Sequence, residues 1–334
     1  MTLLGALDLG GTKILAGVFE ADDLDVGEPA GLTAWRPVGR RQVKTRAEEG
    51  PEAVVARMAD LLRDLAGSRT VRAVGLASPG PLDTRRGVII HAPNLHWRDV
   101  PVVERLEGLV GAPVFLDNDA NLAALAEWSV RDGPDPLLLA TVGTGVGGGI
   151  VIGGEIFHGF RDAAGELGHI TVAAGGAPVE CNCGNRGCLE TAASGSALQR
   201  RLRERLGRDV TAGELARLLA AGDPRALEAI SETARWLGVG LAAAAALLDP
   251  EVIVVGGGVA GLGEPFLRVV REEVRARLMP ASWRGKGGPQ VEAARLGRDA
   301  ALLGAALLAR RRLAVGGPHN GKDGKRDPRK GDPA

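Results

Sequence analysis

The sequence contains no tyrosine, and aromatic residues of all kinds make up only 3% of its 334 positions. Its core must therefore be built mainly from Leu, Val, Ile and Ala. Net charge is absent too, because 41 Lys and Arg balance 41 Asp and Glu. Without a basic excess the chain lacks the field that attracts nucleic acid or an anionic membrane surface, so we expect neither as a partner.

Long apolar runs are also missing. The longest, at 236–248, ends at Asp249 and Pro250 and is shorter than the roughly 18 residues that a membrane-spanning helix needs. The first residues include no basic leader, and Asp8 falls where a signal peptide would be apolar. The three cysteines all lie within 181–188 and cannot form long-range disulfides, which is typical of a reducing compartment. We therefore expect a cytoplasmic protein.

Glycine, by contrast, is abundant, with 50 residues in short clusters between apolar runs. Each half of the chain has a strand, a glycine turn and a strand, followed later by a helix, a buried strand and a glycine loop. In the first half the predicted elements are strands 3–8, 14–19 and 71–77 and a helix that Pro51 opens; in the second they are strands 137–142, 150–152 and 252–255, the turn 143–149 and a helix at 223–248. This weak repeat predicts two related α/β domains that face each other across a cleft.

The domain boundaries follow from this order of elements. We place a small α/β domain at 1–115, completed by a C-terminal helix at 297–313, and a large α/β domain at 116–296. Two further helices are expected in the large domain, at 211–221 and 262–278. Residues 314–334 are polar, rich in Gly and Pro and of mixed charge, so we expect a disordered tail.

Two glycine turns are candidates for binding phosphate. The run 143–149 contains GxGxxG, but a strand follows it, whereas the dinucleotide fingerprint needs a helix; this disfavours a nicotinamide-dependent dehydrogenase. A glycine hairpin can instead present backbone N–H groups to an anion. The turn at 8–13 offers the same groups, together with the carboxylate of Asp8 for a metal ion and the side chains of Thr12 and Lys13. Their matching positions favour phosphate binding over plain tight turns.

A second candidate is the segment 116–121, Leu-Asp-Asn-Asp-Ala-Asn, between a predicted strand at 113–116 and a predicted helix at 122–128. A strand end that leads into a helix is where α/β folds place catalytic groups. An Asx turn with an N-cap would explain one or two of the four polar residues. This segment alone leaves both interpretations open.

The most specific feature is the group of His169, Cys181, Cys183 and Cys188. Three thiolates and an imidazole at this spacing are the ligands of a closed tetrahedral zinc site. Such a site has no open position to activate water, so the zinc would be structural. Unligated buried cysteines are the alternative interpretation.

The motifs together resemble the ROK family of sugar kinases and sugar-responsive repressors, and among its members the bacterial glucokinases in particular. The resemblance covers about 3–313 and rests on DLGGTK at 8–13, NDAN at 118–121, GTGVGGGIV at 143–151, GELGH at 165–169, CNCGNRGCLE at 181–190 and VVGGGV at 254–259. It implies a two-domain actin-like (ribonuclease H-like) ATPase fold with an interdomain cleft. It also implies ATP-dependent phosphorylation of the 6-hydroxyl of glucose with Mg²⁺, structural Zn²⁺, and a homodimer or homotetramer.

The resemblance assigns roles to individual residues, with Asp119 as general base. The sugar-binding residues would be Asn94, Asn118, Asp119, Glu166, His169 and Glu190. Those near the nucleotide would be Asp8, Gly10, Gly11, Thr12, Lys13, Gly143, Thr144, Gly145, Gly256, Gly257 and Gly258. The zinc ligands would be His169, Cys181, Cys183 and Cys188.

Several alternatives stay open at this point. The substrate could be another hexose, such as fructose, mannose or N-acetylmannosamine, and the donor ADP or polyphosphate rather than ATP. A sugar-responsive regulator of the same family would carry an N-terminal helix-turn-helix module, for which a first strand at Leu3 leaves no room. A zinc-dependent binding module without turnover would not need the polar segment around Asp119.

Overall fold

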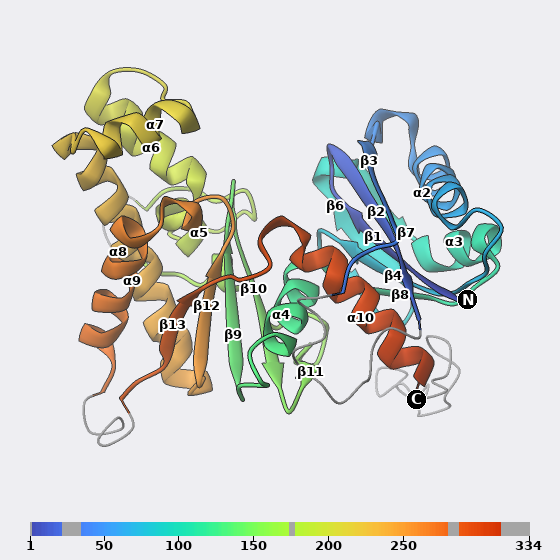
Figure 1. Cartoon of the computed structure of the whole chain (residues 1–334). Coiled ribbons are helices and arrows are strands. Elements are labelled where there is room, and N and C mark those ends of the chain that lie inside the picture. Colours follow the sequence, from blue (N-terminus) through green and yellow to red (C-terminus); the bar gives the residue numbers. More distant parts are fainter. Residues whose placement is uncertain (1, 22–34, 174–177, 280–286, 315–334) are drawn as a thin grey trace, which may run out of the picture. The chain divides into compact units, whose positions relative to one another are not determined.

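The computed structural model describes residues 2–21, 35–173, 178–279 and 287–314. They form two compact units (Figure 1). The first contains the described residues up to 119 together with 302–314, and the second contains the described residues of 120–301. Each unit is built on a five-stranded sheet.

The sheet of the first unit has the strand order β3-β2-β1-β4-β8. Its strands are β1 (Leu3–Leu9), β2 (Lys13–Glu20), β3 (Gly39–Lys44), β4 (Val71–Ser78) and β8 (Val114–Asn118). Strands β1, β2 and β3 are antiparallel, whereas β4 and β8 run parallel to β1. Crossover helices are needed for the parallel strands, and they are α2 (Pro51–Ala66) and α3 (Val102–Val110).

Further elements complete this unit. The last helix, α10 (Ala300–Ala314), lies so close to the sheet that a Cβ atom at Gly75 would be 1.8 Å from the Ala305 carbonyl oxygen. Glycine in β4 is therefore what allows α10 to pack there. A small antiparallel sheet consists of β5 (Leu82–Asp83), β6 (Val88–Ala92) and β7 (Trp97–Val100), and short 3₁₀ turns are η1 (Ala47–Glu49) and η2 (Pro93–Leu95).

The sheet of the second unit has the order β11-β10-β9-β12-β13. Its strands are β9 (Leu137–Val142), β10 (Val146–Ile152), β11 (Glu155–Ile156), β12 (Val252–Gly256) and β13 (Gln290–Ala293). Its helices are α4 (Asp119–Ser129), α5 (Leu189–Ala193), α6 (Gly195–Leu206), α7 (Ala212–Ala220), α8 (Pro224–Leu248) and α9 (Glu264–Arg277). Short 3₁₀ turns are η3 (Leu167–His169), η4 (Ala260–Leu262) and η6 (Gly297–Asp299).

The two sheets share the same topology. In each, the strands in chain order one to five lie in the spatial order three-two-one-four-five, with the first three antiparallel and the last two parallel to the first. The internal repeat and the α/β fold class predicted from the sequence are thereby confirmed. Both cores are mainly aliphatic, as the scarcity of aromatics requires.

Side chains cap the starts of two helices whose ranges were predicted. The Thr211 hydroxyl accepts from the Glu214 N–H at the start of α7, and Asp223 accepts from the N–H groups of Arg225 and Ala226 at the start of α8. A capping oxygen satisfies N–H groups that have no partner within the helix. The predicted boundaries of both helices are correct to within a residue or two.

The predicted glycine turn at 143–149 is too long. The turn comprises 143–145, and β10 begins at Val146 rather than at Ile150. Glycines 147–149 belong to the strand because both of its faces are covered closely. A Cβ atom would lie 2.6 Å from the Ala120 carbonyl oxygen at Gly149 and 2.4 Å from the Gly165 carbonyl oxygen at Gly148. These glycines therefore serve packing.

The segment 116–121 is also divided differently from the prediction. Strand β8 continues to Asn118 and α4 begins at Asp119, so no separate turn lies between them.

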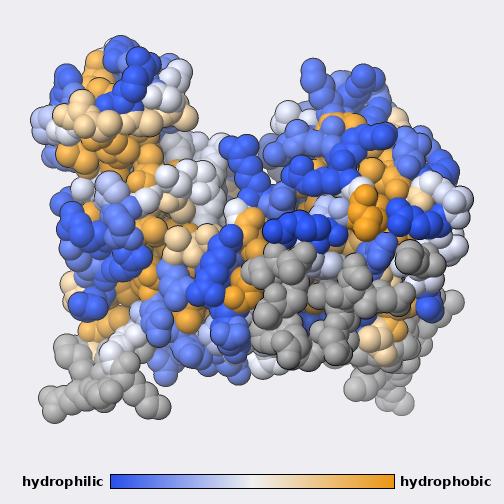
Figure 2. All heavy atoms as spheres, in the orientation of Figure 1, coloured by the Kyte–Doolittle hydropathy of each residue, from blue (hydrophilic) through white to orange (hydrophobic). Residues whose placement is uncertain are grey.

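Hydrophilic side chains are spread over the visible face of both units (Figure 2). Among the described residues, no helix is long and apolar enough to cross a membrane. The predicted tail beyond Ala314 lies outside the described residues.

Candidate functional site

The turn between β1 and β2 is held by a buried threonine. The Thr45 hydroxyl donates to the Gly10 carbonyl at 2.6 Å, and the Thr45 N–H donates to the Thr12 carbonyl at 2.9 Å. Within the turn, the Gly10 N–H donates to the Lys13 carbonyl at 2.9 Å. Thr45 has no exposed surface, and its own carbonyl accepts from Arg57 at 2.7 Å. No motif pointed to Thr45, because it lies 35 residues from Gly10.

Asn94 lies directly against the same turn. A Cβ atom at Gly11 would be 2.6 Å from the Asn94 Cβ and 2.7 Å from its carbonyl oxygen. Thr12 and Lys13, the next residues, are exposed. The turn predicted to hold nucleotide and the asparagine predicted to touch sugar are thus neighbours within the first unit.

The carboxylates of this unit lie at strand ends. Asp8 is in register with Ala77 of β4, and Ala77 is in register with Asp117 of β8. Because β1, β4 and β8 are parallel, their carboxyl ends share one edge of the sheet, the edge where α/β folds bind ligands. Asp117 is buried and its carboxylate accepts from the Asn118 N–H at 2.8 Å. Asp119 follows as the first residue of α4.

In the second unit, the start of α6 holds the turn between β9 and β10. The Gly195 N–H donates to the Gly143 carbonyl at 2.8 Å, and the Ser196 hydroxyl donates to the Thr144 carbonyl at 2.8 Å. Across the turn, the Gly143 N–H donates to the Gly145 carbonyl at 3.0 Å. The backbone carbonyls of Gly143, Thr144 and Gly145 therefore all accept hydrogen bonds from groups of the protein.

The glycine loop after β12 reaches the same place. Gly257 has a φ of 86°, and a Cβ atom there would lie 2.4 Å from the Val142 carbonyl oxygen. The Val259 N–H donates to that oxygen at 3.0 Å. Since Val142 immediately precedes the turn 143–145, the structure brings together two of the glycine segments predicted to lie near nucleotide. Gly258 is exposed, and a Cβ atom there would meet no other atom within 4 Å.

Three residues predicted to bind sugar, Glu166, His169 and Glu190, belong to segments that contact the beginning of β10. Glu166 precedes η3, and His169 is its last residue. This turn packs so closely that a Cβ atom at Gly168 would be 2.1 Å from the Val146 carbonyl oxygen. The Glu166 carboxylate lies 3.9 Å from the His169 Nε2. Glu190, in α5, accepts from the Val146 N–H at 3.0 Å through Oε2. Sequence reasoning did not find this contact of Glu190.

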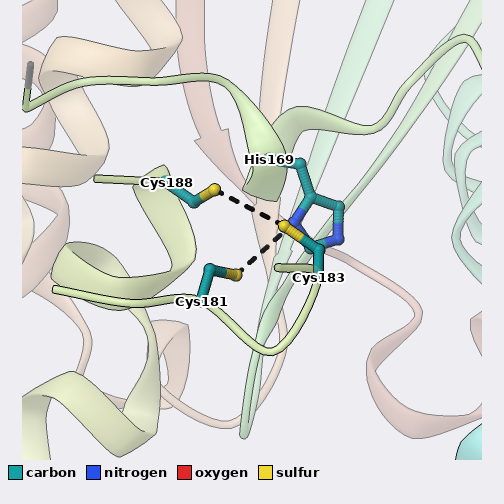
Figure 3. Close-up of side chains that lie close together, drawn as sticks. All are labelled: His169, Cys181, Cys183 and Cys188. Atoms are coloured by element: carbon teal, nitrogen blue, oxygen red, sulfur yellow. Dashed lines mark hydrogen bonds between the residues drawn. The ribbon is translucent and has the colours of Figure 1, made fainter. Parts of the chain in front are cut away.

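His169 and the three cysteines form one cluster (Figure 3). Their ligand atoms all lie within 4.8 Å of one another. The His169 Nδ1 is 3.8 Å from the Cys181 Sγ, and the Cys183 and Cys188 sulfurs are 3.7 Å apart. Bonds of about 2.3 Å from a tetrahedral zinc ion to its sulfurs place ligands about 3.8 Å apart. The spacing in the cluster therefore fits a tetrahedral zinc ion.

The loop backbone produces this spacing. The Cys181 N–H donates to the Asn185 carbonyl at 2.8 Å, and the Leu189 N–H donates to the Ile170 carbonyl at 2.9 Å, which fastens the segment after Cys188 to the one after His169. Gly187 has a φ of 73° and a Cβ atom there would lie 1.9 Å from the Ala173 carbonyl oxygen. Only glycine fits this approach.

Burial and backbone contacts act differently on the thiols. Burial raises the pKa of Cys188 to about 12 and also raises the pKa of Cys181. A hydrogen bond from the Asn185 backbone lowers the pKa of Cys183. Burial therefore disfavours the thiolates of Cys181 and Cys188, whereas a bound cation would stabilise them. The donor set is thus the one that a divalent, thiophilic metal requires.

Comparison with known proteins agrees with these features. The model of the ROK family matches residues 4–312. The chain belongs to the ROK family. The resemblance predicted from the motifs is confirmed, and with it the two-domain actin-like ATPase fold of this family.

Three ROK proteins illustrate the likeness. A glucokinase of Halalkalibacterium halodurans is 38% identical over 91% of this chain and 94% of its own length. The crystal structure of a ROK hexokinase from Thermus thermophilus is 42% identical, with a TM-score of 0.78 over 94% of this chain and 99% of that one. A ROK glucokinase from Streptomyces griseus, solved in complex with glucose and AMPPNP, is 35% identical, with a TM-score of 0.77 over 92% and 99% of the two chains.

Proposed function

We propose that this ROK protein is a glucokinase, which transfers a phosphoryl group from ATP to the 6-hydroxyl of glucose. One observation carries the proposal: the likeness to glucokinases extends over nearly the whole of both chains, and one of them was solved with glucose and AMPPNP. The enzyme class follows from the same likeness.

Asp119 is the proposed general base. In the reaction, the bond from O6 of glucose to the γ-phosphorus forms, the bond from that phosphorus to the β–γ bridging oxygen breaks, and ADP leaves. The proton of the 6-hydroxyl passes to Asp119. Its place at the end of β8 and the start of α4 supports this role, because strand ends of this kind position catalytic groups on a rigid scaffold.

The nucleotide would be held by groups from both sheets. In the first unit these are Asp8, Gly10, Gly11, Thr12 and Lys13, with the Asp8 carboxylate as the residue that would hold Mg²⁺. In the second unit they are Gly143, Thr144, Gly145, Gly256, Gly257 and Gly258. Mg²⁺ neutralises phosphate charge in such reactions. Oxygen ligands are what it prefers, and the exposed Lys13 supplies further positive charge.

Glucose would be held by Asn94, Asn118, Glu166, His169 and Glu190. Carboxylates and carboxamides suit a ligand that is dense in hydroxyl groups, because each hydroxyl both donates and accepts. Structural Zn²⁺ would be held by His169, Cys181, Cys183 and Cys188. With Nδ1 on the cysteine side, the His169 Nε2 faces Glu166, so a metal would fix the ring and leave Nε2 for the sugar.

Turnover of a sugar panel tests the proposal. ADP release is measured with glucose, mannose, fructose, N-acetylglucosamine and N-acetylmannosamine as acceptors of phosphate from ATP, and formation of the sugar phosphate is measured when ADP or polyphosphate is the donor. We expect glucose with ATP to give the highest kcat/KM. A clear preference for another hexose would support the assignment as a kinase but overturn glucose as its substrate. Tight sugar binding without turnover of any sugar would favour a regulator. In solution the protein is predicted to be a homodimer or homotetramer, which sedimentation measures.

A further inference from the structure

Gly145 is a glycine that its own backbone does not require. Glycines at 257 and 187 have positive φ values, but those at 143 and 145 do not, so alanine could adopt the local conformation at both positions. At Gly143 a Cβ atom would meet nothing within 4 Å. At Gly145 it would lie 2.1 Å from the Glu190 Oε2 and 3.0 Å from the Glu190 Cδ.

The Glu190 carboxylate therefore occupies the space that a side chain at 145 would take. Its Oε2 is fixed there by the Val146 N–H, at 3.0 Å. The other oxygen, Oε1, lies 3.9 Å from the Cys181 Sγ, on the side of the cluster that includes His169. Because a carboxylate is planar and rigid, fixing Oε2 also restricts where Oε1 can point.

From this geometry we infer that Gly145 is a positioning residue for the sugar, acting through Glu190, although its motif assigns it to the nucleotide. The inference rests on the proposed function, in which Glu190 binds glucose. Because Gly145 has no side chain, the Glu190 carboxylate fits beside it, and the hydrogen bond from the Val146 N–H fixes its orientation. In this proposal the turn 143–145, which would contact the phosphates, and Glu190, which would bind the sugar, are directly linked through the hydrogen bond from Val146.

Kinetics of two alanine variants in the same turn test the inference. Gly145→Ala displaces Glu190 and should raise the KM for glucose by about tenfold or more, as expected when a polar contact is lost, while the KM for ATP changes less than about twofold. Gly143→Ala, at a residue assigned to the nucleotide where a Cβ atom does not meet Glu190, should act on the KM for ATP rather than on the KM for glucose. Gly213→Ala in α7, where a Cβ atom also meets nothing, controls for glycine replacement in general. A rise in the KM for ATP alone in Gly145→Ala would overturn the inference.

The double variant separates an indirect effect from a direct one. In a Glu190→Ala background the collision is gone, so adding Gly145→Ala should change the KM for glucose by less than about twofold. If the full effect of Gly145→Ala persists in that background, Gly145 acts independently of Glu190 and the inference is wrong. An unchanged KM for glucose in Glu190→Ala alone would overturn it as well, while the kinase activity would stand.

Thermal unfolding gives a readout that does not depend on turnover. Gly145→Ala should lower the Tm, and the loss should largely vanish when Glu190 is already alanine. An equal loss in both backgrounds would contradict the geometry on which the inference rests. If no hexose is phosphorylated, the proposed function fails on its own assay, and this cycle still decides whether Gly145 makes room for Glu190.

Discussion

The two glycine turns occupy equivalent places in two sheets of one topology, yet different groups hold them. In the first unit, the buried Thr45 binds the turn at 10–13 from the end of β3. In the second, the turn at 143–145 is bound by the start of α6 and faces Glu190. The repeated backbone determines where a turn lies, whereas the side chains that hold it are not repeated.

The same contrast extends to the chemistry of the units. The first unit presents carboxylates at strand ends, with Asp8 and Asp119 at one edge of its sheet. The second presents Glu166, Glu190 and the cysteine cluster around the beginning of β10. We therefore expect changes at Asp8 and Asp119 to affect phosphoryl transfer and nucleotide binding, and changes at Glu166, Glu190 and the cysteine cluster to affect sugar binding and the metal.

The largest effect is expected at Asp119. Asp119→Asn should lower kcat by about 10²–10⁴, because the amide keeps the shape of the side chain but cannot accept the proton. Glucose affinity should stay within a few-fold, as measured by calorimetric titration. If more than about a tenth of the wild-type kcat remains, Asp119 is not the base, and the contrast between these two groups of residues fails at its main point.

The metal cluster is the next test, because nothing in the first unit corresponds to it among the described residues. Purified protein should contain about one zinc per chain, as expected for a four-ligand site. Cys188→Ala should lose the metal and lower the Tm, since metal binding stabilises the loop that it closes. The exposed Cys183 gives a matched variant, Cys183→Ser, which should lose the metal as well. Full activity in protein without metal would contradict a structural role.

Thr45 tests the support of the first turn. Thr45→Val keeps the size of the side chain but removes the hydroxyl that donates to Gly10, so the KM for ATP should rise by about tenfold with little change in the KM for glucose. Thr45→Ser should restore the wild-type value. The buried Thr233, which donates to the Ala229 carbonyl within α8, supplies the control: Thr233→Val should alter stability without this kinetic split. Equal changes in both KM values would indicate general damage.

The smallest effect concerns acid stability at the start of α8. The Arg225 side chain is the main cause that lowers the pKa of Asp223 to about 2 from an ordinary value of 3.8. A lowered pKa means that this stabilisation is complete above about pH 4 and is lost as the pH falls through about 2. The Tm of Asp223→Asn should therefore fall less between pH 5 and pH 2 than that of the wild type.

Thr211→Ala is the matched control for that experiment, because it removes a neutral cap from α7. It should lower the Tm by a similar amount at both pH values. An identical acid response of Asp223→Asn and the wild type would mean that the ion pair with Arg225 adds nothing to stability.

Sequence reasoning succeeded where the signal is local. Apolar periodicity located strands β1 and β4 and helix α2, and Pro51 located the start of α2. Such signals act between residues less than about two turns apart. The extent of the second glycine turn was predicted wrongly. A run of glycines is typical of a turn, and the sequence does not show that Ala120 and Gly165 pack closely against Gly149 and Gly148.

The sequence by itself thus determined several elements, such as β1, β4, α2 and α8, together with the repeat, the family motifs and the four residues of the cysteine cluster. Three of those four residues lie within one short loop. Only the tertiary structure decided which residues support them. Thr45 reaches Gly10 across 35 positions, and Glu190 reaches Val146 across 44. Contacts of this kind depend on how strands pair and how helices pack. The free energy that favours this packing comes from the whole core, so no single segment of the sequence predicts it.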